Sequence, residues 1–247
     1  MDAFVTSALV LREVKYNDAD RMLTLLTPEH GVISASAKGS LRLKNKLFSA
    51  CGLFCYSEFK LLPGKSVCRV EEASVKNVFH GLSSSIEGMA LAMYLAEIAM
   101  SLSPSGQESD KLLRLLLNSF YLLSEKKCSV AQVKAVFELR AMSECGFLPQ
   151  LLCCKKCGKY DGQSFYFDVT DGYLLCEDCA NAEHKTTNLN EGSLFAVRHI
   201  CLVEDKKVFS FQISPVAQHF LAVVAEQYAL IHLDKPLKSY TFLKTLL

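Results

Sequence analysis

Four cysteines in the second half of the 247-residue sequence have the spacing of a metal site. Cys154 and Cys157 form one C-x2-C motif, and Cys176 and Cys179 form a second one after residues 158–175. The tight turn of each motif can place two sulfurs on one side of the chain, as half of a tetrahedron. Because cysteine fills all four positions, no ligand position is open for a catalytic water. The pattern predicts one structural Zn²⁺ ion per chain.

The segment between the two motifs must bring the two pairs of cysteines together. Residues 164–169 and 172–175 have strand character, and they are predicted to form a hairpin between the motifs. Gly158 allows the backbone to turn beneath the metal. Four thiolates around Zn²⁺ carry a net negative charge, and three nearby lysines are expected to offset it: Lys155, Lys156 and Lys159.

The chain has eleven cysteines, an odd number that excludes complete pairing in disulfides within the chain. No basic start leads into an apolar block, so we expect no signal peptide and a reducing cytosol. Cys153 would give C-x3-C spacing with Cys157 and is assigned to packing. Six scattered cysteines are expected to be small buried hydrophobic residues: Cys51, Cys55, Cys68, Cys128, Cys145 and Cys201. A ribbon with weak or lost metal and a redox centre remain alternatives to structural zinc.

A basic stretch in the first part of the chain is the second candidate site. The net charge is only +1, but no acidic residue lies between Glu29 and Glu58. Cations in such an interval can neutralise the phosphates of a nucleic-acid strand and release its counterions. Four residues are therefore candidates for nucleic-acid contact: Lys38, Arg42, Lys44 and Lys46. The alternative is a basic loop that contacts only solvent.

Aromatic residues close to this stretch could stack on bases. In the strand predicted at 52–62, Phe54 and Tyr56 alternate with residues expected to face the core. They would stack on bases unless a neighbouring domain covers them. Arg12 and Arg21 could extend the basic track, although ordinary surface charges are the simpler expectation.

The elements that would position these residues are of two kinds. Strand patterns and turn residues recur up to residue 80 and fit a small Greek-key barrel of the OB type, or an SH3-like barrel. The expected strands are 3–14, 21–27, 32–38, 52–62 and 67–79. From about residue 83 the apolar spacing becomes helical. The domains are therefore predicted as a barrel at 1–80, a helical domain at 81–247, and a zinc ribbon inserted at 147–186.

Capping residues locate the predicted helices. Ser84 and Glu87 have the spacing of a capping box for a helix that ends before Pro104. Asn190 is the expected cap of a later helix, and Ser214 that of the last long helix. Residues 109–125 are apolar on nearly all sides and are predicted to form the centre of a helix bundle.

No catalytic motif is present in the sequence. Gly64-Lys65-Ser66 matches the end of a P-loop, but Phe59 stands where the first glycine is required. The longest apolar run, 89–96, is far shorter than the roughly 18 residues that span a bilayer. A membrane protein is therefore excluded, and an enzyme of unknown chemistry is the weakest hypothesis. The main alternative to a nucleic-acid binder is a protein–protein adaptor with a structural zinc ribbon and no direct DNA role.

Motifs along nearly the whole chain resemble the RecO family of bacterial DNA repair proteins. In chain order, they are 10–12, 16–21, 25–31, 37–39, 145–149 with Leu151, the four cysteines, 233–239 and 242–243. Each motif alone is weak, whereas their order and spacing together are specific. The resemblance implies an N-terminal OB-fold, a helical domain and an inserted zinc ribbon, with no enzymatic activity.

The resemblance also implies what such a protein does. RecO-like proteins bind single- and double-stranded DNA, anneal complementary strands and, with RecR (and RecF), help to load RecA onto strands coated by single-strand-binding protein. The family's contact with the C-terminal tail of single-strand-binding protein maps to the helical domain. Lys38, Arg42, Lys44 and Lys46 are the implied DNA contacts in this sequence. The implied location is the bacterial cytoplasm, at the nucleoid during repair.

Overall fold

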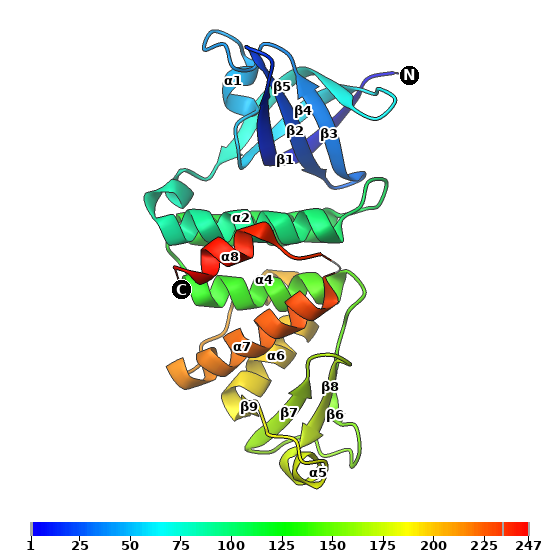
Figure 1. The fold of residues 1–247 in the computed structure, drawn as a ribbon, viewed down its shortest axis with the longest axis vertical. Coiled ribbons are helices and arrows are strands. Elements are labelled where there is room, and N and C mark those ends of the chain that lie inside the picture. The colour runs from blue at the N-terminus through cyan, green and yellow to red at the C-terminus, as the bar shows by residue number, and fades with distance from the viewer. Residues whose placement is uncertain (1, 234, 247) are drawn as a thin grey trace. The chain divides into compact units, whose positions relative to one another are not determined.

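The computed structural model describes residues 2–233 and 235–246, which form two compact units (Figure 1). The barrel unit comprises the residues up to Glu125 together with those from Leu237 onward, and the ribbon unit is Lys126–Pro236. The domain limits expected from the sequence, 1–80, 81–247 and 147–186, remain predictions. Asp234, part of the last RecO-like motif, lies outside the described residues.

Five strands form a closed barrel in the order β1-β2-β3-β5-β4. Their bounds are Phe4–Tyr16 (β1), Asp20–Thr27 (β2), Gly31–Ala37 (β3), Cys55–Leu62 (β4) and Cys68–Val78 (β5). β3 and β5 pair in parallel, and the other neighbours pair antiparallel. This order is that of the five-stranded Greek-key barrel of the OB type. The expected OB-fold is confirmed, and the SH3-like alternative is set aside.

Alternation of apolar and polar residues along the strands explains why the barrel closes. In β4, Cys55, Ser57, Phe59 and Leu61 are buried, while the residues between them point outward. β2 alternates in the same way at its start, with Leu23 and Leu25 inside. A strand whose side chains alternate between core and solvent buries one face of the sheet, and closure removes the free edges.

Four helices and one 3-10 turn complete the described part of the barrel unit: α1 (Leu47–Ala50), η1 (His80–Ser84), α2 (Ile86–Leu102), α3 (Asp110–Ser124) and α8 (Lys238–Lys244). The predicted capping box at Ser84 is wrong by one residue. Ser85 is the N-cap, and its hydroxyl accepts a hydrogen bond from the Gly88 amide at 2.9 Å. Ser84 instead ends the 3-10 turn and donates to the Gly81 carbonyl at 2.7 Å.

The prediction that residues 109–125 form the centre of a bundle is also wrong. α3 buries one apolar face and exposes Lys111, Arg114 and Asn118 on the other. The helix whose residues are buried without interruption is α4 (Val130–Glu144), in which 133–142 are all buried. α4 packs against α6 (Glu191–Leu202) and α7 (Pro215–His232) within the ribbon unit.

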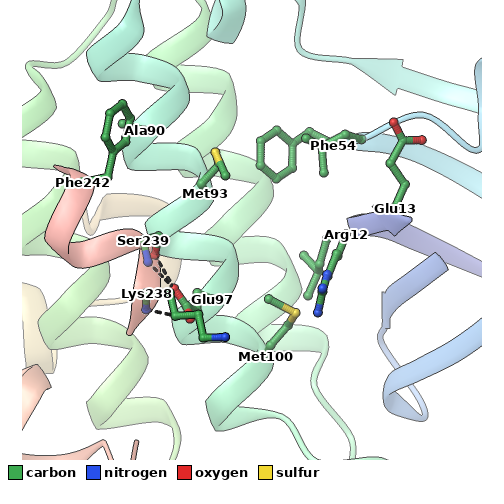
Figure 2. Close-up of a pocket in the computed structure, with 12 residues that line it drawn as sticks. Arg12, Glu13, Phe54, Ala90, Met93, Glu97, Met100, Lys238, Ser239 and Phe242 are labelled. Atoms are coloured by element: carbon green, nitrogen blue, oxygen red, sulfur yellow. Dashed lines mark hydrogen bonds between the residues drawn. The ribbon is translucent and has the colours of Figure 1, made fainter. Parts of the chain in front are cut away.

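The C-terminal helix α8 packs on α2, and one carboxylate of α2 binds its first residues (Figure 2). Leu237, the N-cap residue of α8, supplies no side-chain cap. Glu97 of α2 accepts hydrogen bonds from the backbone amides of Lys238 at 3.0 Å and Ser239 at 2.8 Å, and from the Ser239 hydroxyl. Although burial raises it, the pKa of Glu97 is lowered overall by these donors and by the Lys238 charge. The carboxylate thus satisfies orphan amides at the start of α8.

The remaining elements of the ribbon unit form a small sheet beside its helices. The sheet order is β6-β8-β7-β9, with bounds Gln150–Cys154 (β6), Ser164–Asp168 (β7), Tyr173–Cys176 (β8) and Leu189–Asn190 (β9). Short helix α5 (Glu177–Ala182) follows β8, and 3-10 turn η2 (Asp205–Lys207) follows α6. The predicted hairpin is confirmed as the antiparallel pair β7–β8. Asn190 and Ser214 cap α6 and α7, as expected.

Within residues 2–233 and 235–246, no helix is both long enough and apolar enough to cross a bilayer.

Candidate metal centre and nucleic-acid interface

The four cysteines of the two C-x2-C motifs come together at one end of the small sheet. The sulfurs of Cys154, Cys157, Cys176 and Cys179 all lie within 4.8 Å of one another. Cys154 and Cys176 are buried, Cys179 is half-buried and Cys157 is exposed. Four soft thiolate donors at this spacing fit a tetrahedral metal ion without an open position. Cys153 is half-buried and stands outside the cluster.

Strand ends and tight turns position these sulfurs. Cys154 ends β6 and Cys176 ends β8, while Cys179 lies in α5. The Gly158 amide donates to the Cys154 carbonyl at 3.0 Å, which closes the first turn. Gly158 has φ +73°, and a Cβ there would meet no atom within 4 Å. Glycine is therefore required for its left-handed backbone and not for space.

Backbone amides aimed at the cluster stabilise negative charge on sulfur. Burial raises the pKa of Cys154, but the backbone amides of Cys157, Cys176 and Lys156 outweigh it and lower that pKa to about 6. The pKa of Cys179 is raised to about 12, mainly by its hydrogen bonds with the Cys176 and Cys157 sulfurs. Protons shared among thiols in this way are the ones that a bound cation displaces.

The three lysines near the first motif each have another partner. Lys156 pairs with Glu183, and Lys159 pairs with Asp178 at 3.3 Å. The Lys155 ammonium lies 4.0 Å from the centroid of the Tyr173 ring. These acidic partners neutralise part of the positive charge that was expected to offset the negative thiolates.

The basic stretch forms the loop between β3 and α1 (Leu47–Ala50), and all four predicted contacts are exposed. Within the described part of the chain, no ion pair involves Lys38, Arg42, Lys44 or Lys46. Leu43, between them, is 82% exposed. Four exposed cations that form no ion pair with any described residue can contact a polyanion.

Two residues of the β1–β2 hairpin fix the shape of this loop. Asp20 accepts a hydrogen bond from the Gly39 amide at 2.7 Å, and the Leu41 amide donates to the Ala19 carbonyl at 2.9 Å. The pKa of Asp20 is lowered, first by the Gly39 amide and further by Asn17, Lys38 and Arg42, against a smaller effect of desolvation. The loop is therefore tied to the hairpin at two points.

The expectation that Arg21 is an ordinary surface charge is wrong. Arg21 is 8% exposed and pairs with Glu13 at 2.9 Å. One terminal nitrogen of its guanidinium donates to the carbonyls of Ser40 and Phe48, each at 2.9 Å. Arg21 thus joins both ends of the basic loop from inside and is not available to a nucleic acid.

Arg21→Met is expected to lower the free energy of unfolding by about 1.5–3 kcal/mol, because hydrogen bonds from a charged donor are lost at a buried site. Urea denaturation of the purified variant measures this. Arg12→Met removes an exposed arginine of the neighbouring strand and should change the free energy by at most about 0.5 kcal/mol. Equal effects of the two substitutions would contradict the structural role of Arg21.

The structure does not support base stacking by the aromatic residue Phe54, which was a candidate from the sequence. Phe54 is 4% exposed and packs edge-on against Phe120 of α3, with ring centroids 4.9 Å apart, so it cannot stack on a base. Tyr56 is half-buried on the outer face of β4. Tyr16, at the end of β1, is 55% exposed and is the register partner of Asp20, which binds Gly39 of the basic loop; Lys15 next to Tyr16 is also exposed. The sequence pattern gave no reason to select Tyr16, because its neighbourhood depends on the fold.

Two acidic residues also enter this end of the barrel from the β1–β2 hairpin. Asp18 is exposed and Asp20 is half-buried. The interval without acids, 30–57, therefore overstates the local positive charge. The hairpin and the loop together still carry five exposed cations: Lys15, Lys38, Arg42, Lys44 and Lys46.

A separate apolar hollow of about 670 Å³ lies in the barrel unit between α2, α8 and β1. Figure 2 shows Phe54 pointing toward Met93 in its wall. Met93 and Phe242 are each about half exposed, so the hollow is open to ligands. Its charged lining consists of two cations and two carboxylates: Arg12, Lys238, Glu13 and Glu97.

Comparisons with known proteins match the whole chain to one family. The model of the recombination protein O N-terminal domain matches residues 1–79, and that of the C-terminal domain matches residues 83–241. A DNA repair protein RecO of Acetivibrio thermocellus is 33% identical over 246 residues, covering 100% of this chain and 98% of that protein. DNA repair protein RecO of Alkaliphilus metalliredigens is 29% identical over 230 residues, covering 93% and 94%.

The two family models meet where the barrel passes into the helices, and the relatives match over their full length. These matches cover both the OB-type barrel and the part of the chain that carries the four-cysteine ribbon. The chain belongs to the RecO family of DNA repair proteins, which act as non-enzymatic recombination mediators.

Proposed function

We propose that this chain binds single- and double-stranded DNA through the loop between β3 and α1 and anneals complementary strands. The observation that carries the proposal is the set of four exposed cations without ion-pair partners among the described residues: Lys38, Arg42, Lys44 and Lys46. Asp20 and Arg21 hold this loop in one shape. A preorganised loop loses little conformational entropy when it binds.

Annealing follows from charge neutralisation and needs no ATP. Two complementary strands repel each other through their phosphates, and cations at the barrel end reduce this repulsion. The contacts are to the backbone, which carries no sequence information. The base edges remain free to pair with the second strand.

We propose that Zn²⁺ is the ion held by Cys154, Cys157, Cys176 and Cys179. Support comes from the donor set, since four thiolates in two knuckles form the closed tetrahedral site of structural zinc. The ion holds the ends of β6 and β8 together and takes no part in DNA chemistry.

We further propose that the chain acts with RecR, and with RecF and RecA indirectly, in the bacterial cytoplasm. For the C-terminal tail of single-strand-binding protein, the apolar hollow of the barrel unit is the proposed contact. A chain end carries a carboxylate, and Arg12 and Lys238 beside the methionine-lined wall suit a terminal carboxylate next to an apolar side chain.

Lys38→Glu combined with Arg42→Glu is expected to abolish most binding of a labelled single-stranded oligonucleotide. Four phosphate contacts predict a slope of about −3 for the logarithm of affinity against the logarithm of salt concentration, and loss of two contacts reduces it to about −1.4. Fluorescence anisotropy across a salt series measures both quantities. Annealing of two complementary oligonucleotides, bare and coated with single-strand-binding protein, should slow in parallel.

Lys206→Glu with Lys207→Glu is the matched control, because it changes the net charge equally at two exposed lysines of the ribbon unit. Its affinity and salt slope should equal those of the wild type. Unchanged affinity in the loop variant would favour the adaptor without a direct DNA role.

A further inference from the structure

Tyr16 is an exposed aromatic residue that the described fold leaves uncovered. It is the last residue of β1, and its register partner across the hairpin is Asp20 of β2. The residue is 55% exposed. Within residues 2–233 and 235–246, no hydrogen bond and no ring contact involves its side chain. A tyrosine exposes this much apolar surface at a cost unless something covers it.

Two other tyrosine rings, one exposed and one half-buried, are covered by cations. The Arg198 guanidinium lies 4.2 Å from the centroid of the Tyr160 ring, which is 54% exposed like Tyr16. The Tyr173 ring has the Lys155 ammonium at 4.0 Å. No cation lies over the Tyr16 ring among the described residues, although five exposed cations occupy the same end of the barrel. The face of this ring is therefore available to a flat partner.

The backbone ties Tyr16 to the basic loop. In the hairpin turn after Tyr16, the Ala19 carbonyl accepts a hydrogen bond from the Leu41 amide. The Asp20 carboxylate accepts a second one from the Gly39 amide. Asn17 has φ +56°, a left-handed conformation that asparagine tolerates and that sets the tight turn. Hydrogen bonds thus connect the hairpin that carries Tyr16 to the basic loop at one end of the barrel.

We propose that Tyr16 stacks on an unpaired base of a strand whose phosphates contact the basic loop, and that it thereby gives the site a preference for single strands. The inference rests on the DNA contact proposed for that loop. A base in a duplex is already stacked on both sides, whereas an unpaired base offers its face to an aromatic ring. The cations would contact the phosphates of single- and double-stranded DNA alike, whereas the ring would stack only on an unpaired base of a single strand.

Tyr16→Ser is expected to lower the affinity for a labelled oligothymidylate about tenfold, within the roughly 5- to 150-fold range of one stacked base. Affinity for a duplex of equal length should change less than twofold, and Tyr16→Phe should retain both affinities. An equal loss for single strand and duplex, or no loss for the single strand, overturns the proposal.

The loop variant separates this result from the proposed DNA contact. Lys38→Glu with Arg42→Glu should weaken the binding of single strand and duplex together. If it does so while Tyr16→Ser has no effect, the DNA contact stands and the stacking role is wrong. If it has no effect while Tyr16→Ser selectively weakens single-strand binding, the stacking role stands and the contact lies elsewhere.

A direct measurement is available because the chain contains no tryptophan. Tyr16→Trp introduces a single indole, whose emission should be quenched when it stacks on a base of oligothymidylate. Tyr121→Trp, at a residue 44% exposed on α3, is the control and should show no quenching at the same degree of binding. Emission of the Tyr16→Trp variant that stays constant while anisotropy reports binding contradicts stacking.

Discussion

Cys154→Ser combined with Cys157→Ser is expected to abolish binding of the zinc ion proposed for the four-cysteine site and to unfold the small sheet of the ribbon unit. Two of the four sulfurs are lost, and an apparent binding free energy of about 10–16 kcal/mol for structural zinc is then no longer available to folding. Beyond the metal site, the sheet packs against α5, α6 and α7. Its own apolar core is small: Leu151, Phe165, Phe167, Leu174, Leu175 and Leu189.

Elemental analysis should find one zinc per wild-type chain and none in the double variant. Limited proteolysis should cut the variant between β6 and β9 while α4 remains protected. DNA affinity should change little, because the basic loop lies in the barrel unit.

Cys153→Ser is the matched control, since Cys153 is a neighbouring cysteine that stands outside the cluster. It should keep its zinc and its resistance to protease. A metal-free wild type that resists proteolysis equally well would refute the structural role of the ion.

The parts of the fold that sequence could predict are those fixed by local pattern. Alternation along β4 placed Phe59 and Leu61 in the core, because successive side chains of a strand point to opposite faces. Asn190 and Ser214 were correctly expected as caps, since each cap uses an amide only three residues further on. The cysteine spacing belongs to the same class, because each knuckle is a local turn.

The errors arose where the outcome depends on contacts remote in sequence or on a choice between equal neighbours. Ser84 and Ser85 are chemically equivalent caps, and the 3-10 turn that ends at Ser84 decides between them. The burial of Arg21 depends on Glu13, Ser40 and Phe48, none of which a strand pattern connects to it. Phe54 is covered by Phe120, a partner 66 positions away in a helix.

The same distinction between local pattern and remote contacts applies to the candidate DNA site. The four cations were found because they are adjacent in sequence, whereas Tyr16 and Asp18 reach them only through the barrel. The RecO resemblance supplied the function as a whole. It supplied none of the hydrogen bonds that hold the loop, which are visible only in the fold.

A second large effect is expected at Arg140, in the buried part of α4. Arg140 is 7% exposed and donates to the carbonyls of Ile200 at 3.1 Å and Cys201 at 3.2 Å, near the end of α6. It also pairs with Glu144 at 2.9 Å and with Asp205. One guanidinium therefore fixes the end of α6 and the following turn against α4.

Arg140→Met is expected to lower the free energy of unfolding by about 3–5 kcal/mol, because it removes a buried cation from its acidic partners and leaves two carbonyls without their donor. Urea denaturation followed by circular dichroism measures the loss, which is a large fraction of the total for a typical domain. Arg114→Met is the matched control. Arg114 pairs with Asp110 on the surface of α3, with a side chain 70% exposed, and its replacement should cost at most about 1 kcal/mol. If the two substitutions cost the same, burial does not determine the strength of the Arg140 network, and the packing of α4 against α6 rests on its apolar contacts alone.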